Sequence, residues 1–318
     1  MKKYDVVTVG SGVVDVFVDT GMKGTNGKIC YAIGEKIPIK HLNFSTGGGG
    51  TNTAASFSKL GLKTGFLGKI GDGHNAGIIL RDLKKFGVDF LGVKSKLHTG
   101  YSIVLDSREN DRTIFTYKGA GEALRFGEID KKAFNTKWFY FTSMNDEAFE
   151  TQVKLAGYAF NKGIRLAYNP GMSQIKDRLS EVKSILKFTN VLIVNKQEAM
   201  ALAHKKDFIK ELKSMTMGVV CVTDGKNGCS VYDGEVLISV EAHKNVKCVE
   251  RTGAGDAFGA GFVSGLIRTG DLEKAVQVGS LNAEGVIQIP GAKNGILSWS
   301  SAMRKMRENP VKVVKRVY

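Results

Sequence analysis

Short apolar runs that alternate with helix-periodic segments are the feature that most limits how this chain can fold. Strand-like runs lie at residues 6–9, 63–70, 88–93, 138–141, 164–168, 191–194 and 219–222. Segments typical of helices stand between most of them, at about 54–60, 75–86, 147–161, 179–186 and 199–203. Apolar strands joined by helical crossovers are typical of parallel sheets covered on both faces. Because no repeat or linker interrupts the pattern, it predicts a single α/β domain over residues 1–318, with a doubly wound, mostly parallel sheet flanked by helices.

Two segments depart from this alternation and predict a smaller sheet. Residues 13–19 are rich in β-branched side chains, and residues 21–44 are polar and turn-rich without helical periodicity. Residues 100–106 and 112–117 alternate on either side of the polar turn 107–111, which predicts a β-hairpin. We expect these segments, about 12–44 and 100–117, to form a small β lid over the edge of the main sheet.

Composition excludes several classes of protein. A chain of 318 residues with 42% hydrophobic and 24% charged residues is typical of a globular protein with a sizeable core. No apolar run reaches the ~18 residues of a membrane span, and the N-terminal residues lack a signal-peptide pattern. The four cysteines show no Cys-x-x-Cys spacing, which is typical of free thiols in a reducing compartment. We therefore expect a cytoplasmic protein with no membrane partner.

The net charge of +15 raises the question of a nucleic-acid partner. The lysines are spread along the chain, some as pairs such as Lys2-Lys3 and Lys84-Lys85, and only the C-terminal tail, with Lys312, Lys315 and Arg316, approaches a cluster. No basic stripe is interleaved with aromatic residues, so we expect no nucleic-acid binding. A basic surface can still help to attract an anionic substrate.

The stretch Thr252-Gly253-Ala254-Gly255-Asp256 reads as a tight turn that opens a helix, because apolar residues at helical spacing follow it. Backbone N–H groups at such a turn lack intrahelical partners and carry the positive end of the helix dipole. They can hold a phosphate or a developing anion, and glycines let the backbone approach it. Asp256 stands where it could take a proton from a group held there. The alternative is an ordinary glycine-rich loop with an acid in the first helical turn.

Four consecutive glycines at 47–50 predict a flexible or close-approach segment, because glycine is costly inside a helix or strand. Asn52 follows at the entry to a helix, either as an N-cap or as an amide that contacts a polyhydroxylated ligand. Asp15 interrupts an apolar run, either on the exposed face of an edge strand or as a carboxylate that holds hydroxyl groups.

Asn195 and Glu198 come at the end of a predicted strand, where open parallel sheets bind their ligands. A spacing of three places the two side chains within one helical turn of each other. They could orient the waters of a bound Mg²⁺, which keeps several waters in proteins. The same pattern is also a plain capping box, and the pair alone favours that interpretation.

Four stretches together resemble the ribokinase-like (PfkB) sugar kinases over essentially the full chain. Residues 47–52 are similar to the N-terminal signature of that family, and residues 68–73 continue it. Residues 111–114 resemble its lid hairpin, residues 195–198 its N-x-x-E motif, and residues 252–256 its C-terminal signature. The resemblance implies an ATP-dependent phosphotransferase that phosphorylates a hydroxyl group of a sugar or sugar acid.

The resemblance also implies roles for single residues. Asp256 would be the general base, and Gly253, Ala254 and Gly255 would form the anion hole. The acceptor would be bound by Asp15, Gly48 and Asn52, with Gly47 and Gly48 as the hinge for lid closure. The nucleotide would be bound by Asn195, Asn282 and the strand-turn residues Thr223, Gly225 and Gly228. Asn195 and Glu198 would organise Mg²⁺ through its water ligands. A homodimer formed through the lid strands is a further implication, and exposed strand edges make it physically sensible.

Three positions depart from the pattern of the family. Glu250-Arg251-Thr252 replaces the usual Asp-Thr-Thr, which puts activation by a monovalent cation in doubt and leaves Arg251 without an assigned role. Gly49 stands where ribokinases commonly carry lysine, and Asn169-Pro170 where many sugar kinases carry Asp-Pro. The identity of the acceptor therefore stays open.

Other functions remain possible at this stage. A nucleoside kinase of the same fold would need aromatic residues for a base, and Phe17, Tyr101 and Phe115 are candidates, although packing within the lid explains them equally well. A non-catalytic sugar or nucleotide sensor would keep the fold, but it would not need to retain Asp256. A nucleic-acid-binding protein is supported by net charge alone.

Overall fold

A computed structural model describes residues 2–22, 28–106, 112–203 and 207–317. The predicted turn at 107–111, with Asp111 of the lid-hairpin motif, lies outside the described residues, and so does part of the predicted lid segment, residues 23–27.

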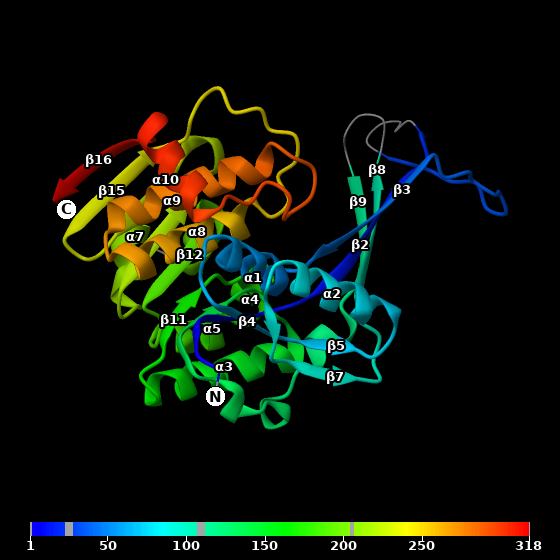
Figure 1. The fold of residues 1–318 in the computed structure, drawn as a ribbon, viewed down its shortest axis with the longest axis horizontal. Helices are drawn as coiled ribbons and strands as arrows, with labels where there is room; N and C mark the ends of the chain where they lie inside the picture. Colours follow the sequence, from blue (N-terminus) through cyan, green and yellow to red (C-terminus); the bar gives the residue numbers. More distant parts are fainter. Residues whose placement is uncertain (1, 23–27, 107–111, 204–206, 318) are drawn as a thin grey trace.

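The centre of the molecule is a ten-stranded sheet with the order β16-β15-β14-β13-β12-β11-β10-β1-β4-β6 (Figure 1). Seven neighbouring strands are parallel: β6 (Asp89–Phe90), β4 (Thr64–Leu67), β1 (Tyr4–Val9), β10 (Thr136–Phe141), β11 (Arg165–Tyr168), β12 (Val191–Asn195) and β13 (Val219–Thr223). Three antiparallel strands extend one edge: β14 (Cys229–Tyr232), β15 (Val236–Glu241) and β16 (Lys312–Val317). The predicted doubly wound, mostly parallel sheet is thus confirmed.

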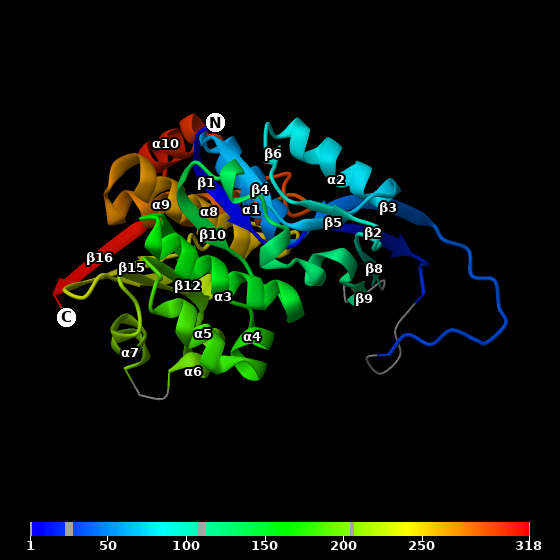
Figure 2. The same ribbon diagram turned by 90° about the horizontal axis from the view of Figure 1, so that it is seen from below.

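Helices cover both faces of this sheet (Figure 2). One face carries α1 (Gly49–Lys59), α8 (Ala254–Thr269), α9 (Leu272–Ile287) and α10 (Trp299–Glu308). The other carries α3 (Asp146–Asn161), α4 (Met172–Asp177), α5 (Leu179–Leu186), α6 (Lys196–Leu202) and α7 (Phe208–Ser214). Short 3₁₀ turns lie at η1 (Gly119–Ala123), η2 (Phe126–Glu128), η3 (Lys131–Ala133) and η4 (Gly225–Asn227).

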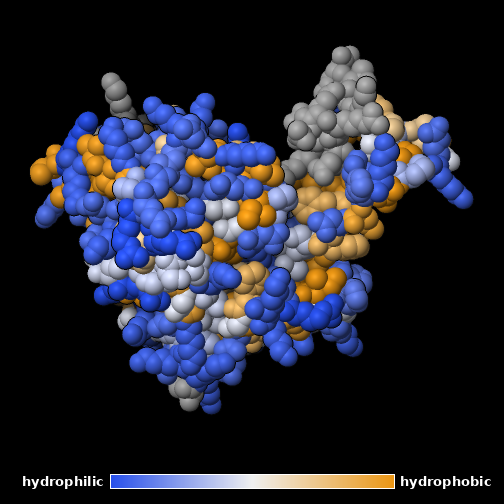
Figure 3. Space-filling view, turned by 45° about the horizontal axis from the view of Figure 1, so that its top comes forward, coloured by the Kyte–Doolittle hydropathy of each residue, from blue (hydrophilic) through white to orange (hydrophobic). Residues whose placement is uncertain are grey.

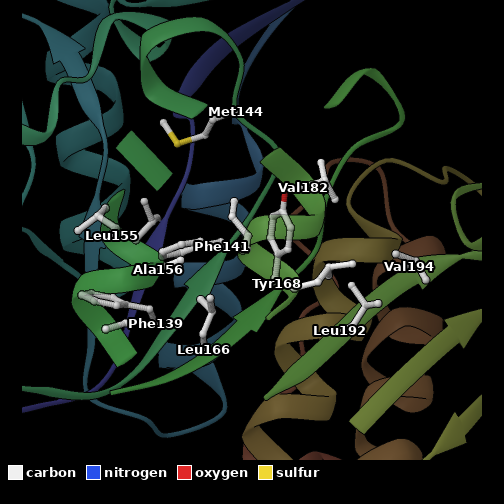
Figure 4. Packing of buried hydrophobic residues seen from close by; sticks show 14 of the residues in the cluster. Phe139, Phe141, Met144, Leu155, Ala156, Leu166, Tyr168, Val182, Leu192 and Val194 are labelled. Atoms are coloured by element: carbon white, nitrogen blue, oxygen red, sulfur yellow. The ribbon is translucent and has the colours of Figure 1, made fainter. Parts of the chain in front are cut away.

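Alternate residues of the same strands fill two separate cores. Phe139, Phe141, Tyr168 and Leu192 pack toward α3 and α5 (Figure 4), whereas Tyr140 and its neighbours pack toward α8 and α9. This is the period of two that places successive strand side chains on opposite faces. Because both faces are buried, the strands read as continuous apolar runs in the sequence, and the carboxyl ends of β12 and β13 are held rigidly.

A separate four-stranded sheet, called the small sheet below, projects from the main body (Figure 1). It has the order β3 (His41–Gly47), β2 (Val13–Asp19), β8 (Gly100–Asp106) and β9 (Arg112–Tyr117). Strand β2 pairs on both sides, so Asp15 lies on an interior strand and not on an edge strand. Helix α2 (His74–Lys85) packs beside β2, and a two-stranded sheet, β5 (Lys69–Gly71) and β7 (Val93–Ser95), lies nearby.

Two local expectations differ from the structure. Helix α1 begins at Gly49, so two of the four glycines form its first turn instead of a flexible segment. A Cβ on Gly50 would lie 2.6 Å from Phe66 and 2.7 Å from the Gly10 carbonyl carbon, so the glycines do permit a close approach. The basic C-terminal tail is not a charge cluster but strand β16, where Lys312 pairs with Glu241 at 2.8 Å. Within the described ranges, no helix is long and apolar enough to cross a membrane.

Candidate active site

The N-terminus of α8 forms the turn that the sequence predicted around Gly253. Gly253 is the N-cap with φ of 80°, a left-handed conformation that favours glycine. The first helical bond runs from the Ala257 N–H to the Gly253 carbonyl at 2.8 Å. Among the described residues, no acceptor is found for the N–H groups of Gly255 and Asp256. The Ala254 N–H differs from the expectation, because it donates to the Arg251 carbonyl at 3.2 Å.

A pocket of about 230 Å³, called the inner pocket below, lies in front of this turn. Its walls come from the carboxyl ends of β12 and β13 and from the start of α8. It is lined by Asn169, Ile193, Val194, Asn195, Glu198, Thr223, Gly253, Gly255 and Asp256. The parallel strands thus bring residues from three predicted motifs, far apart in sequence, to one cavity.

Asp256 carries the most perturbed carboxyl group of this pocket. Burial raises its pKa to about 6, and a hydrogen bond from Asn52 and the charge of Lys293 offset only part of that effect. Asn52 Nδ2 donates to Asp256 Oδ2 at 2.8 Å across 204 residues of sequence. The Asn52 Oδ1 atom is buried and has no hydrogen-bond partner among the described residues. An acceptor atom is therefore left open beside a carboxylate that is poised to accept a proton near neutral pH.

Asn195 and Glu198 form the capping box that the sequence favoured. The Glu198 N–H donates to Asn195 Oδ1 and the Asn195 N–H to Glu198 Oε2, each at 2.9 Å. Both residues also line the inner pocket, and burial raises the pKa of Glu198. The cap fixes the orientation of the two side chains beside the cavity, so the capping interpretation is confirmed and a role toward Mg²⁺ stays a prediction.

The side chains around the inner pocket do not suit a metal ion that is coordinated directly by the protein. In the part of the chain that the structure describes, no cluster of three or more His, Cys, Asp or Glu side chains could hold a metal ion. One carboxylate and one amide at a cavity wall suit a hydrated Mg²⁺, which keeps most of its waters and takes further oxygens from phosphates.

The other residues that were predicted to bind the nucleotide differ in whether they lie at the inner pocket. Thr223 lines the inner pocket, and Gly225 and Gly228 shape the turn after it with φ of 53° and 95°. A Cβ on Gly228 would lie 1.8 Å from the Val240 carbonyl oxygen, so the fold itself requires glycine there. Asn282 instead is fully buried and joins helices, with Nδ2 donating to Ala257 O at 2.8 Å and to the Ser56 hydroxyl. Nothing in this geometry supports a nucleotide contact for Asn282.

The predicted acceptor residues gather where the small sheet joins the main body. Gly48 is the N-cap of α1 with φ of 92°, and a Cβ there would lie 2.5 Å from the Ser11 carbonyl oxygen. A Cβ on Gly47 would lie 2.1 Å from Asp15 Oδ2, so glycine makes room for this carboxylate. Burial raises the pKa of Asp15, and Ser102 and the charge of Lys293 partly offset the effect.

Lys293 is the site residue that the sequence did not reveal. Its side chain is buried, and Nζ donates to Asp82 Oδ2 at 2.8 Å and to Thr46 Oγ1 at 2.9 Å. Thr46 also donates to Asp82. Lys293 therefore joins the C-terminal part of the chain to α2 and to β3, and its charge acts on both Asp15 and Asp256. A lone lysine in a polar loop gives no sequence signal for such a contact.

A second cavity of about 1810 Å³, called the outer pocket below, lies between the small sheet, α2 and the segments 247–251 and 290–294. Thr46, Asp82 and Lys293 line it, and so do exposed basic residues of α2 and of the segment 247–251. The outer pocket opens toward solvent beside the predicted acceptor residues, because Thr46 precedes Gly47 in the chain and the charge of Lys293 acts on Asp15. Asp15, Gly47, Gly48 and Asn52 are not themselves among its lining residues.

Comparison with known protein families matches residues 20–299 to the pfkB family of carbohydrate kinases. An uncharacterized sugar kinase of Archaeoglobus fulgidus is 27% identical over 75% of this chain and 97% of its own length. A nucleoside kinase of Methanocaldococcus jannaschii is 25% identical over 83% of this chain and 86% of its own length.

Solved structures give the same result for the fold. The crystal structure of the Methanocaldococcus jannaschii nucleoside kinase covers 97% of this chain and all of its own, with a TM-score of 0.81 and 22% identity. Ribokinase from Thermotoga maritima covers 96% of this chain and 99% of its own, with a TM-score of 0.81 and 21% identity. A putative ribokinase of E. coli was solved in complex with ATP and Mg²⁺, and its TM-score is 0.82 at 18% identity.

Proposed function

The chain belongs to the pfkB family of carbohydrate kinases, and on that premise we propose that it transfers the γ-phosphoryl group of ATP to a hydroxyl group of a sugar or sugar acid. Asp256 takes the proton of the acceptor hydroxyl, whose oxygen forms a bond to the γ-phosphorus. The bond between the γ-phosphorus and the oxygen that bridges it to the β-phosphorus breaks, and ADP leaves. Phosphoryl transfer asks a protein mainly for positioning and for stabilisation of charge.

The hydrogen bond between Asn52 and Asp256 is the observation that carries this proposal. It joins the acceptor side, at the start of α1, to the inner pocket, at the start of α8. Asn52 Oδ1 can accept a hydrogen bond from a neighbouring hydroxyl of a polyhydroxylated acceptor, while Asp256 removes the proton of the reacting hydroxyl. A pKa of about 6 keeps Asp256 ionised at neutral pH and still basic enough to act as a general base.

The N–H groups of Gly255 and Asp256 supply the anion hole for the transferring phosphoryl group. Both lack acceptors among the described residues, and the helix dipole adds positive potential at the same place. Of the predicted Gly253, Ala254 and Gly255, only Ala254 has an N–H that is already used among the described residues, so Gly253 stays a candidate donor beside Gly255 and Asp256. The left-handed Gly253 sets the direction of these donors.

ATP would lie with its phosphates in the inner pocket, beside Asn195 and Thr223. Glu198 and Asn195 would hold Mg²⁺ through its waters, and the metal would neutralise charge on the phosphates. The capping box keeps both side chains in place before the nucleotide arrives.

Loss of the proposed base tests this function. We expect wild-type protein with Mg-ATP to release ADP in a coupled assay only when a suitable acceptor from a panel of pentoses, hexoses, sugar acids and nucleosides is present. Asp256→Asn should lower kcat about 10²- to 10⁴-fold while ATP still binds. Activity of that variant within a few-fold of wild type would contradict the role of Asp256. Turnover of any acceptor would exclude a non-catalytic sensor.

A nucleoside acceptor is the second candidate, because aromatic side chains line the outer pocket. Phe17, Phe44 and Phe86 are among its lining residues, and a base could stack on such rings. The other two aromatic candidates from the sequence do not line this pocket: Tyr101 packs against the core beside α2, and Phe115 is 60% exposed. Phe17→Ala should raise the KM of a nucleoside about tenfold if its base stacks there, and it should affect a free sugar less.

Pairing of two small sheets is the oligomeric arrangement that we propose. Large hydrophobic side chains on one face of this sheet are exposed, among them Leu42, Phe44, Ile103, Phe115 and Tyr117. Figure 3 shows hydrophobic residues gathered where the small sheet projects from the body. Monomers rarely expose such contiguous apolar surface. Light scattering should give the mass of a dimer for the wild type and of a monomer for Phe115→Lys, and a monomeric wild type would contradict this arrangement.

A further inference from the structure

Basic side chains line the outer pocket in excess of acidic ones. Six cationic residues contribute to its wall (Lys40, Arg81, Lys85, Lys247, Arg251 and Lys293), against Asp19, Asp82 and Glu250. Lys293 and Asp82 neutralise each other through their ion pair at 2.8 Å. The remaining cations outnumber the remaining acids, so the pocket favours an anion.

Two of these cations stand together on one wall. Arg81 and Lys85 are four residues apart on α2, a spacing that places both on the same side of a helix. Both side chains are exposed, and both line the pocket beside Asp82. Asp82 already accepts hydrogen bonds from Lys293 and Thr46, so it is engaged elsewhere.

The lining of the outer pocket also includes Arg251, the residue to which the sequence assigned no role. Arg251 and Lys247 belong to the segment that leads into the Gly253 turn, and both are exposed within the pocket lining. Glu250, between them, accepts a hydrogen bond from the Gly291 N–H at 2.7 Å. Considering the described residues alone, Arg81, Lys85 and Arg251 form no ion pair with an acidic side chain.

We propose that the acceptor is a sugar derivative that carries an anionic group, phosphate or carboxylate, and that Arg81, Lys85 and Arg251 bind this group in the outer pocket. This inference rests on the proposed kinase function and assigns a substrate class to it. The hydroxyl to be phosphorylated would reach Asn52 and Asp256, and the anionic group would point outward between α2 and the segment 247–251. Arginine suits this task, because its planar fork binds phosphate and carboxylate in a bidentate manner.

Exposure of these cations has a kinetic consequence. Interactions between solvent-exposed charges weaken as salt rises, because the Debye length falls to about 3 Å at 1 M ionic strength. We expect KM for an anionic acceptor to rise with added KCl more steeply than KM for a neutral acceptor. Chloride salts of potassium and of choline should have the same effect if screening alone is responsible.

Competing acceptors give the direct test with the wild-type protein. Three matched sets are compared in the ADP-release assay: free sugars and nucleosides, their phosphate monoesters, and the corresponding sugar acids. The proposal expects kcat/KM for the best anionic acceptor to exceed that of its neutral counterpart at least tenfold. Comparison of the phosphate set with the carboxylate set then shows which anionic group the protein binds. A neutral acceptor that is used best would overturn the inference and leave the proposed kinase function intact. Failure of every acceptor would instead contradict the kinase function.

Single variants then test the named residues. Arg81→Gln and Arg251→Gln should each lower the ratio of kcat/KM for the anionic acceptor to that for its neutral counterpart about tenfold to a hundredfold. Arg251→Lys should recover part of this loss because it keeps the charge. Lys84→Gln is the matched control, since Lys84 is an exposed cation of the same helix that does not line the pocket, and the ratio should not change.

Two outcomes would overturn the assignment of these residues. An equal fall of the ratio in Lys84→Gln would mean that only general surface charge matters. A rise in KM for ATP, with the acceptor ratio unchanged, would place Arg251 on the nucleotide instead. Circular dichroism and the melting temperature of each variant confirm that it is folded, and the acceptor comparison with wild-type protein stands without the variants.

Discussion

The inner and outer pockets of this kinase are built in different ways. Strand ends and helix starts of the central sheet form the inner pocket, and each contributes a short motif of neighbouring residues, such as Asn195 with Glu198. The outer pocket instead depends on single side-chain contacts between elements, such as the contact of Lys293 with Asp82 across 211 residues. Both pockets join residues that are far apart in sequence, but only the inner pocket is built from short motifs that can be recognised in the sequence.

The largest effect that we expect comes from a substitution at the turn of the inner pocket. A Cβ on Gly253 would lie 2.7 Å from the Ala292 Cβ, and its φ of 80° disfavours any other residue. Gly253→Ala should therefore lower kcat at least about a hundredfold, because the anion-hole donors move, and destabilise the fold by about 1–3 kcal/mol. Steady-state kinetics and urea unfolding measure the two effects.

Gly255→Ala is the matched control for that variant. A Cβ there meets nothing within 4 Å, and Gly255 lies in the first turn of α8. Its free energy of unfolding should not fall, but kcat should fall because the methyl group enters the inner pocket beside the phosphoryl group. Equal unfolding stability of the two variants would show that the strained turn does not matter.

Most features of the inner pocket were predicted from the sequence. The parallel strands, the Gly253 turn, the Asn195–Glu198 pair and the position of Asp256 depend on local patterns, and the structure contains each of them. The small sheet was also predicted, because period-two alternation marked β2, β8 and β9. The resemblance to one family added the roles, which remain proposals for the individual residues.

Other features could not be predicted, because tertiary packing decides them. Gly49 and Gly50 join a helix despite their poor propensity, since a Cβ on Gly49 would meet Thr142 and one on Gly50 would meet Gly10 and Phe66. The buried contacts of Asn282 depend on how three segments meet. Strand β16 was missed because its charged residues hid a sheet edge. Cytoplasmic location and dimerisation stay predictions, and activation by a monovalent cation, which Glu250 puts in doubt, is untested.

The next largest effect is the loss of stability that we expect when the contact between Lys293 and Asp82 in the outer pocket is broken. Lys293 and Asp82 have side-chain exposures of 7% and 21%, so removal of one partner leaves the other charge poorly solvated. Lys293→Met should lower the free energy of unfolding by about 3 kcal/mol, as measured in urea. The double variant Lys293→Met, Asp82→Asn should recover part of this loss. Additive effects of the two changes would contradict an energetic link between α2 and the segment 290–294.

A smaller effect concerns the carboxylate of Asp256 in the inner pocket. The folded pKa of Asp256 is about 6 and its ordinary value is 3.8, so ionisation of this group costs folding free energy as pH rises between these values. Asp256→Asn removes that cost and should stabilise the inactive protein by about 1–2 kcal/mol at pH 8. Urea unfolding should show the gain shrinking as pH falls from about 6 toward 3.8, with none left at lower pH. A variant less stable than wild type at pH 8 would show that the carboxylate is not strained by burial.

The pH dependence of kcat/KM for the best acceptor tests most directly whether Asp256 is the base between the two pockets. Because kcat/KM reports ionisations of the free enzyme, the account predicts a fall of unit slope below about pH 6. The hydrogen bond from Asn52 lowers the pKa of Asp256, so Asn52→Leu should move this limb to higher pH. A profile that stays flat from pH 5 to 8, or a limb that Asn52→Leu leaves in place, would contradict the assignment of Asp256 as the general base.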